Sequence, residues 1–465
     1  MAATQRRRTK PMKVPAKKPT GILVHAYPVG FGDCLLLRFD YASAEQRHVL
    51  IDFGTTALPA SAPPNTMARI ADDIRRRCGG KLHAVIATHR HQDHISGFAT
   101  AANGKGSGDV IASCRPDVVL QPWTEDPLAA TDAVKPTSDR AARLRGFVRG
   151  LAGMQAVASM VQGEARALRG QATRAVGRNL VEELDFVGGT NLPNRSAVEN
   201  LVRMARRGTG VYAHHGSDAG LRALLPGVRM SVLGPPTLEQ SDQIRRQREE
   251  DPDEFWHLLG LSGGTAAQAP PAAFPRAPRY ASIPPGARWL RRKLLEVRSQ
   301  QLLQIVRTLD DEMNNTSLIL LFEVGPFRLL FPGDAQIENW EYTLRKARAS
   351  AALKARLAGA DLYKVGHHGS LNATPRTLWG WFAKRSKRPG DERLWSVIST
   401  RKGKHGSATR NTEVPRRTLV EALRAETRYI STEDLKFKGK QAGVTPQIIE
   451  LDVARGTIRK MVSTG

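Results

Sequence analysis

The run Thr88-His89-Arg90-His91-Gln92-Asp93-His94 follows an apolar segment at 84–87 and carries the strongest chemical signal in the chain. Side chains at this spacing cannot all point the same way on a strand or on one face of a helix. On a loop that closes a strand they can converge. Imidazole suits Zn²⁺ and neighbouring first-row ions, and a carboxylate adds charge and can orient a water. We therefore expect a metal site with four ligands from this run: His89, His91, Asp93 and His94.

Three other segments place polar residues at the ends of predicted strands. Asp52 follows the apolar residues 49–51, Asp334 follows 327–331 and a Pro-Gly turn, and His367 and His368 follow 363–365. Asp334 has a second interpretation as an ordinary turn residue, since Gly-Asp is common in turns. Lys364 has two interpretations, a contact to a phosphate or a solvated residue at a strand edge.

His89-x-His91-x-Asp93-His94 is the HxHxDH signature of metallo-β-lactamase-fold hydrolases, and the chain resembles that family. The segments around Asp52, Asp334 and His367 occur in the family's order. The resemblance is closer to the hydrolase domain of ComEC-type DNA-uptake proteins and its stand-alone relatives. Five segments carry this closer resemblance: Val29-Gly30-Phe31-Gly32-Asp33-Cys34, Val232-Leu233-Gly234-Pro235-Pro236, Asn314-Asn315-Thr316-Ser317-Leu318, His367-His368-Gly369-Ser370 and Ile398-Ser399-Thr400.

The resemblance implies an α/β fold, the metallo-β-lactamase αββα sandwich with a helical insertion. It also implies two divalent ions, Zn²⁺ in the first instance and Mn²⁺ as the alternative. His89 and His91 would hold the first ion, and Asp93 and His94 the second. Asp334 would bridge the two ions and His367 would complete the second site. The remaining expected roles are catalysis for Asp93, contact with the substrate for His368 and orientation of a ligand for Asp52.

The chain departs from the family pattern in two places. Many members supply a third His to the first metal from the stretch that corresponds to 314–317, which contains none here. The first site is therefore incomplete or completed by a weaker oxygen ligand. Near the C-terminus, 411–415 stands where relatives often carry Gly-His-Pro, with His405 nearby.

The organisation follows from composition along the 465 residues. Residues 1–20 form a basic arm that we expect to be disordered, and 21–465 form one hydrolase domain. Two insertions interrupt the domain, a helical one with a basic face at about 137–205 and a partly irregular one at about 236–295. We also predict strands at 22–26, 35–39, 49–51, 84–87 and 363–365, a hairpin at 317–331, and helices at about 289–311 and 337–357.

Seventy Lys and Arg against 44 Asp and Glu leave a net charge of +26. Such an excess attracts polyanions, and nucleic acid is the partner we expect. The alternative is a solvated, Arg-rich surface. No apolar run approaches the roughly 20 residues that cross a bilayer, and the N-terminus lacks the apolar centre of a secretory signal. From the lack of an apolar run we expect no membrane association. The three scattered cysteines fit a reducing compartment, and we expect a cytoplasmic protein.

These observations favour a metal-dependent phosphodiesterase or nuclease that uses a water activated by two metal ions. Two alternatives remain open. One is a small-molecule hydrolase of the same fold, acting on a lactam, lactone, thioester or cyclic nucleotide. The other is a non-catalytic nucleic-acid-binding or scaffold protein. The sequence identifies no particular nucleic-acid-binding residues.

Overall fold

The computed structural model describes residues 17–126, 195–241, 313–406, 412–435 and 444–461, without residues 43 and 391, together with residues 243 and 437. Four predictions lie wholly or mostly outside this part of the chain. They are the basic arm, the helical insertion, the second insertion and the helix at about 289–311. The described residues form a mixed α/β protein with two sheets.

The larger sheet has eight strands, antiparallel from β14 to β3 and parallel from β3 to β6. In spatial order they are β14 (Thr457–Met461), β13 (Gln447–Asp452), β1 (Pro19–Ala26), β2 (Cys34–Tyr41), β3 (Gln46–Phe53), β4 (Ala84–Ile86), β5 (Val118–Pro122) and β6 (Thr209–Ala213). The predicted strands at 22–26, 35–39, 49–51 and 84–87 are confirmed as β1 to β4.

The smaller sheet has six strands, parallel from β12 to β9 and antiparallel from β9 to β7. In spatial order they are β12 (Arg428–Ser431), β11 (Trp395–Ile398), β10 (Leu362–Lys364), β9 (Phe327–Phe331), β8 (Ile319–Val324) and β7 (Val228–Gly234). The predicted hairpin is confirmed as β8 and β9, and the strand at 363–365 as β10. Each sheet therefore has one antiparallel and one parallel half.

Alternate residues of the strands enter two different cores. In β3, Val49 and Ile51 pack between the two sheets, whereas Leu50 packs under the helices of the larger sheet. Because successive strand residues point to opposite faces, a strand that is apolar on both faces must be covered on both sides. The rings of Phe39 and Phe322 stack across the sheets with centroids 6.3 Å apart. The sheets thus face each other directly.

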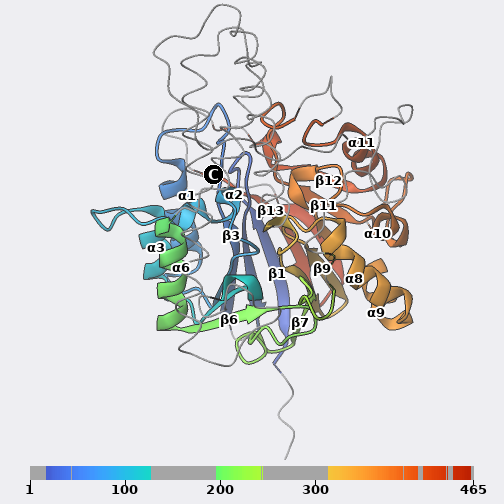
Figure 1. Ribbon diagram of the computed structural model, residues 1–465, viewed down its shortest axis with the longest axis horizontal. Coiled ribbons are helices and arrows are strands. Elements are labelled where there is room, and N and C mark those ends of the chain that lie inside the picture. Colours follow the sequence, from blue (N-terminus) through green and yellow to red (C-terminus); the bar gives the residue numbers. More distant parts are fainter. Residues whose placement is uncertain are drawn as a thin grey trace, which may run out of the picture.

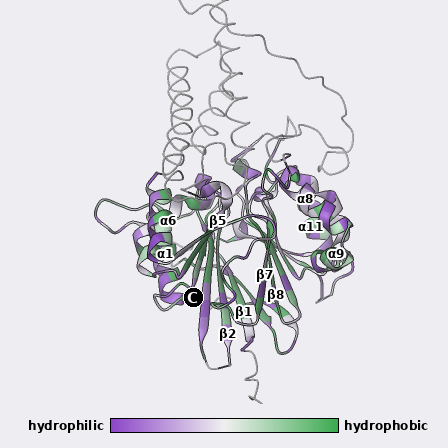
Figure 2. Ribbon diagram, turned by 60° about the horizontal axis from the view of Figure 1, so that its bottom comes forward, coloured by the Kyte–Doolittle hydropathy of each residue, from purple (hydrophilic) through white to green (hydrophobic). Residues whose placement is uncertain are grey.

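Helices cover the outer face of each sheet, so that the order of layers is helix, sheet, sheet, helix (Figures 1 and 2). On the larger sheet lie α1 (Thr66–Arg77), α3 (Ser107–Ser113) and α6 (Arg195–Arg207); on the smaller lie α8 (Ile337–Arg348), α9 (Ala351–Ala358), α10 (Arg376–Trp381) and α11 (Arg417–Glu426). In the described part of the chain, no helix combines the length and the apolar character needed to cross a membrane.

Two helices differ from the sequence prediction. The prediction of a single helix at 337–357 is wrong in one respect, because α8 and α9 are separate helices. Ser350 is the N-cap of α9, and its Oγ accepts a hydrogen bond from Leu353 N at 3.3 Å. A serine that bonds the backbone in this way favours a helix start over a helix interior. The end of the range predicted as a helical insertion is α6, whose Val198 and Leu201 are buried in the domain core.

Two histidines of the larger sheet stay neutral when the chain is folded. Burial, with the charge of Arg77, lowers the pKa of His25 from 6.5 to about 4, and its Nδ1 bonds Leu36 O at 3.0 Å. Burial also lowers the pKa of His48 to about 3. Between about pH 6.5 and about pH 4 the unfolded chain therefore takes up protons that the folded chain does not. Stability is present above this window and is lost as the pH falls through it.

We accordingly expect the free energy of unfolding, measured by urea titration, to fall between about pH 6.5 and about pH 4. In His25→Gln the amide can still donate to Leu36 O but does not titrate. This variant should lose less stability than the wild type over the same interval. An unchanged pH dependence in His25→Gln would show that His25 does not cause the acid sensitivity.

Candidate metal centre

Strands from both sheets end at the same place in the fold. Asp52 is the penultimate residue of β3, the histidine run follows β4, Asp334 follows β9, and His367 and His368 follow β10. Figure 1 shows α2 (Gln92–Ile95), which contains part of the histidine run, beside the end of β3. Ligands of α/β proteins bind at the carboxyl ends of parallel strands, and this is where the chemically competent residues gather.

The backbone after β4 changes direction within the histidine run. His89 and His91 precede α2, and His91 has an extended conformation (φ −59°, ψ 149°) as its N-cap. Asp93 and His94 lie inside α2, so the run is half loop and half helix, rather than the loop that we expected. All four side chains are buried. The turn at His91 allows them to face a common centre.

The first group of possible ligands contains His89, His91 and Asp93, whose ligand atoms lie within 4.8 Å of one another. His89 Nε2 is 3.0 Å from His91 Nδ1. The side chain of Asn314 also reaches this group, with its Oδ1 3.1 Å from His91 Nδ1. Asn314 comes from the stretch in which the resemblance led us to look for a third His.

The second group contains Asp93, His94, Asp334 and His368. His94 Nε2 is 3.0 Å from Asp334 Oδ2, and His368 Nε2 is 2.9 Å from Asp93 Oδ2. The Nε2 atom of His368 is also 3.5 Å from Asp334 Oδ2. Asp93 belongs to both groups, so the two groups are continuous.

Asp52 supports the second group from behind. Its Oδ2 is 2.8 Å from His94 Nδ1, and its carboxylate accepts hydrogen bonds from Thr88 N at 2.7 Å and Thr88 Oγ1 at 2.8 Å. Asp52 has a positive φ of 54°, which is uncommon for a residue other than glycine. These contacts hold the ring of His94 with Nε2 directed at Asp334.

The structure separates the roles of His367 and His368. His367 and His368 have φ values of 42° and 51°, and this tight turn directs only His368 into the second group. The Nδ1–H of His368 donates to Ser399 O at 2.8 Å, which leaves Nε2 facing the carboxylates. His367 is half-buried, its Nδ1 bonds Ser370 Oγ at 2.9 Å, and it belongs to none of the ligand groups found among the described residues. The geometry thus offers His368, in place of His367, as the ligand.

Lys364 is not at a solvated strand edge. It is 2% exposed and forms an ion pair with Asp33, which is 1% exposed. The pair joins β10 of the smaller sheet to the turn before β2 of the larger sheet. Asp33 Oδ2 is 3.7 Å from His94 Nδ1, so the pair lies directly behind the second group. A buried Lys that is engaged in this way is not available to meet a phosphate.

Neighbouring charges decide which groups of the site are protonated. Burial opposes a charge on His94, but Asp334 and Asp52 outweigh it and raise the pKa of His94 well above its ordinary value. Burial also opposes a charge on Asp334, yet His94 and His368 lower its pKa well below the usual range. Burial lowers the pKa of His89 well below its ordinary value. The site therefore concentrates carboxylate charge where a cation can take the place of a proton.

The donor set fits a divalent cation. One buried carboxylate oxygen of the site, Asp93 Oδ1, has no hydrogen-bond partner among the described residues. Leaving such atoms without a partner costs about 1–3 kcal/mol each. A cation between the two groups would satisfy the carboxylate oxygen, and mixed imidazole and carboxylate donors are those of zinc and its first-row neighbours.

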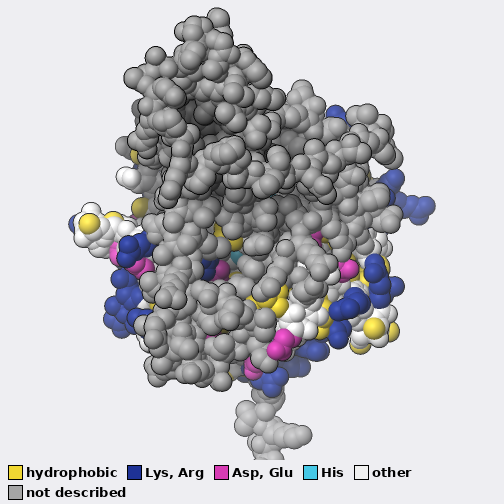
Figure 3. Space-filling view, viewed as in Figure 1, with side chains coloured by type: hydrophobic (Ala, Val, Ile, Leu, Met, Phe, Trp, Pro, Cys, Tyr) yellow, Lys and Arg dark blue, Asp and Glu magenta, His cyan; other side chains and the backbone are white. Residues whose placement is uncertain are grey.

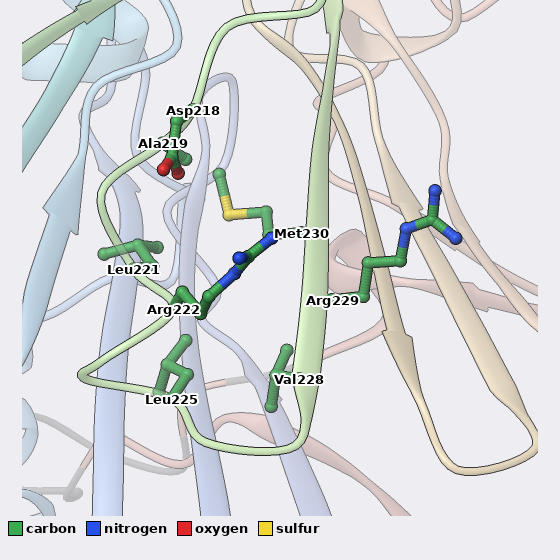
Figure 4. Close-up of a pocket in the computed structure, with 8 residues that line it drawn as sticks. All are labelled: Asp218, Ala219, Leu221, Arg222, Leu225, Val228, Arg229 and Met230. Atoms are coloured by element: carbon green, nitrogen blue, oxygen red, sulfur yellow. The ribbon is translucent and has the colours of Figure 1, made fainter.

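A pocket at another place in the fold is lined by none of the residues of the ligand groups. It lies between the segment that follows β6 and strand β7, and its walls include Leu221, Leu225, Val228 and Met230 (Figure 4). The side chain of Arg229 points away from it, and its Nε is 3.5 Å from Glu323 Oε2. The pocket carries no group from the metal centre.

Comparisons with known proteins do not place the chain in a family. No protein-family model matches it, and no curated protein matches its sequence. Interpretation of the site therefore depends on its own geometry. Asn314 and the Asp33–Lys364 pair are the features that sequence reasoning did not assign to the site. Their only signals were the missing third His, the turn at Asp33 and a Lys three residues before His367.

The adjacent histidines form a natural matched pair for a binding experiment. We expect His368→Ala to weaken Zn²⁺ binding, measured by calorimetry, by more than the roughly 10–100-fold that loss of a supporting partner costs. His367→Ala should have a much smaller effect, because its ring bonds Ser370 instead. The reverse order would mean that His367 is the ligand, as the sequence suggested.

Lys364→Met should destabilise the protein by about 3–5 kcal/mol in urea unfolding, because it leaves Asp33 buried and without its counterion. The double variant Lys364→Met with Asp33→Leu should recover much of that loss. A single variant within about 1 kcal/mol of the wild type, the range of an exposed ion pair, would contradict the burial of this pair.

Proposed function

We propose that this protein is a metal-dependent hydrolase of the metallo-β-lactamase fold that cleaves phosphodiester bonds in nucleic acid. The observation that carries the proposal is the pair of buried ligand groups that share Asp93. Two facing sheets with helices outside them agree with the αββα sandwich of that family, and the HxHxDH run lies at the strand ends where such a site belongs.

Each ligand group would hold one ion. His89 and His91 would hold the first, His94 and His368 the second, and Asp93 and Asp334 would provide the negative charge between them. Bound divalent ions lower the pKa of water towards about 7 and neutralise the charge that develops on the oxygens of the substrate.

The residues around the ligands supply orientation and a dry environment. Asp52 fixes the ring of His94, and the carbonyl of Ser399 fixes the ring of His368. Because each of these rings is held through Nδ1, its Nε2 is directed at the carboxylates. The buried Asp33–Lys364 pair lies behind His94, with Asp33 Oδ2 3.7 Å from His94 Nδ1. Side chains that are locked in this way lose little entropy when they bind a ligand.

The charge of the chain supports a polyanionic substrate. The net charge is +26, and Lys and Arg side chains lie along both flanks of the face seen in Figure 3. A phosphodiester carries negative oxygens that suit a pair of divalent cations, and a basic surface suits a polymer of such groups. We also propose a cytoplasmic location, which is supported by three cysteines that are all free.

Hydrolysis of bis-p-nitrophenyl phosphate and of single- and double-stranded DNA tests the proposal. We expect metal-dependent cleavage that falls by about 10³-fold or more in Asp93→Ala and His94→Ala, since several kcal/mol of charge stabilisation are lost with the metal. His214→Gln, a change at a histidine outside the ligand groups, is the control. Cleavage of DNA should weaken steeply as salt rises, because bound phosphates release counterions.

Other outcomes point to the two alternatives. A chain that binds metal without cleaving any phosphodiester would be a small-molecule hydrolase of the same fold. A chain that binds DNA in the presence of a chelator and never cleaves it would be a scaffold protein.

A further inference from the structure

The two ligand groups are unequal in composition. The second has two imidazoles, His94 and His368, and two carboxylates, Asp93 and Asp334. The first has His89 and His91 and shares Asp93 with the second. Protein zinc sites hold the ion with at least three protein ligands. Because Asp93 is shared with the second group, only His89 and His91 belong to the first group alone.

Asn314 lies beside the first group. Its side chain is buried, with 1% of the residue exposed. Its Oδ1 is 3.1 Å from His91 Nδ1, which in turn is 3.0 Å from His89 Nε2. His91 Nδ1 therefore lies within about 3 Å of both an imidazole nitrogen and an amide oxygen.

The backbone at Asn314 is held firmly. Asn314 O accepts a hydrogen bond from Ser317 N at 3.0 Å, and Leu318 N donates to Thr88 O at 2.9 Å, directly before His89. Asn339 Nδ2 donates to Ser317 O at 2.7 Å. These bonds tie the segment before β8 to the histidine run and fix the backbone from which the Asn314 side chain reaches His91.

We propose that the amide oxygen of Asn314 is the third protein ligand of the first metal position, and that the two positions therefore differ in affinity and metal preference. This inference rests on the proposed function, because it presupposes a metal centre. An amide oxygen is a neutral, hard donor, whereas imidazole suits zinc. The first position thus binds Zn²⁺ more weakly than the second and accepts Mn²⁺ more readily than a site with three histidines would.

A purely orienting role for Asn314 predicts something different. In that case the amide oxygen only accepts the Nδ1–H of His91 and holds its ring. Replacement by His would then disturb His91 and weaken the first position. If Asn314 is a ligand, replacement by His supplies a better donor for zinc and strengthens it. The direction of the change in Asn314→His separates the two roles.

The experiment is metal titration of the full chain after removal of metal. Calorimetry with Zn²⁺ and with Mn²⁺ would be combined with a metal count after dialysis and with the absorption spectrum of the Co²⁺-loaded protein. The wild type should bind one Zn²⁺ tightly and a second more weakly by about tenfold or more, the range over which one group near a metal changes affinity. Asn314→His should reduce the difference in affinity between the two Zn²⁺ ions and change the Co²⁺ spectrum. Asn314→Asp should raise the affinity of the first position for Mn²⁺ relative to Zn²⁺.

Asn314→Ala should lose the weaker ion, and Asn315→Ala is the control. Asn315 is the neighbouring buried amide, and its Nδ2 bonds Glu338 Oε2 at 3.3 Å; Glu338 belongs to none of the ligand groups found among the described residues. If Asn314→Ala does not fold, the His and Asp variants still decide the matter. Two Zn²⁺ ions of equal affinity in the wild type, or a weaker first position in Asn314→His, would overturn the inference. Failure of both the wild type and Asn314→His to bind any metal would instead reject the metal centre and the proposed function with it.

Discussion

The structure depends on how it accommodates several carboxylates in its interior. The central arrangement is the chain Asp52–His94–Asp334, in which the imidazole Nδ1 bonds Asp52 at 2.8 Å and Nε2 lies 3.0 Å from Asp334 Oδ2. An unpaired carboxylate in such a place would be costly. The two carboxylates raise the pKa of His94, because they stabilise the positively charged form of the imidazole between them. A metal ion can perform the same electrostatic task, and this makes the cluster a candidate centre.

This requirement also explains why the two sheets end together. Asp52 lies in β3 of the larger sheet and His94 lies in α2, which follows β4 of that sheet, while Asp334 and His368 follow strands of the smaller sheet. None of the contacts between these pairs can form unless the parallel halves of both sheets present their carboxyl ends to the same space. The ion pair between Lys364 and Asp33 also joins the two sheets, and it lies behind His94. The interface between the sheets is apolar along its length and ionic at this end.

Of the six non-glycine residues with positive φ in the described part of the chain, three lie at this site. Asp52, His367 and His368 all have positive φ values, although none of them is glycine. Such conformations persist only where the surroundings determine them strongly, and they often mark functional sites. Here the strain has an identifiable result, because it aims Asp52 at His94 and His368 at Asp93. The unequal donors on the two sides of Asp93 suggest that the two halves of the centre have different tasks.

The sequence alone determined the strands and the histidine run, because strand alternation and the spacing of His89, His91, Asp93 and His94 are local properties. It could not decide between His367 and His368, since one backbone turn determines which of two identical neighbours faces inward. Nor could the burial of Lys364 beside Asp33, or the contact of Asn314 with His91, be predicted from it. Those partners are 331 and 223 residues apart in the chain. Only the packing of one sheet on the other brings them together, and no local pattern encodes that distance.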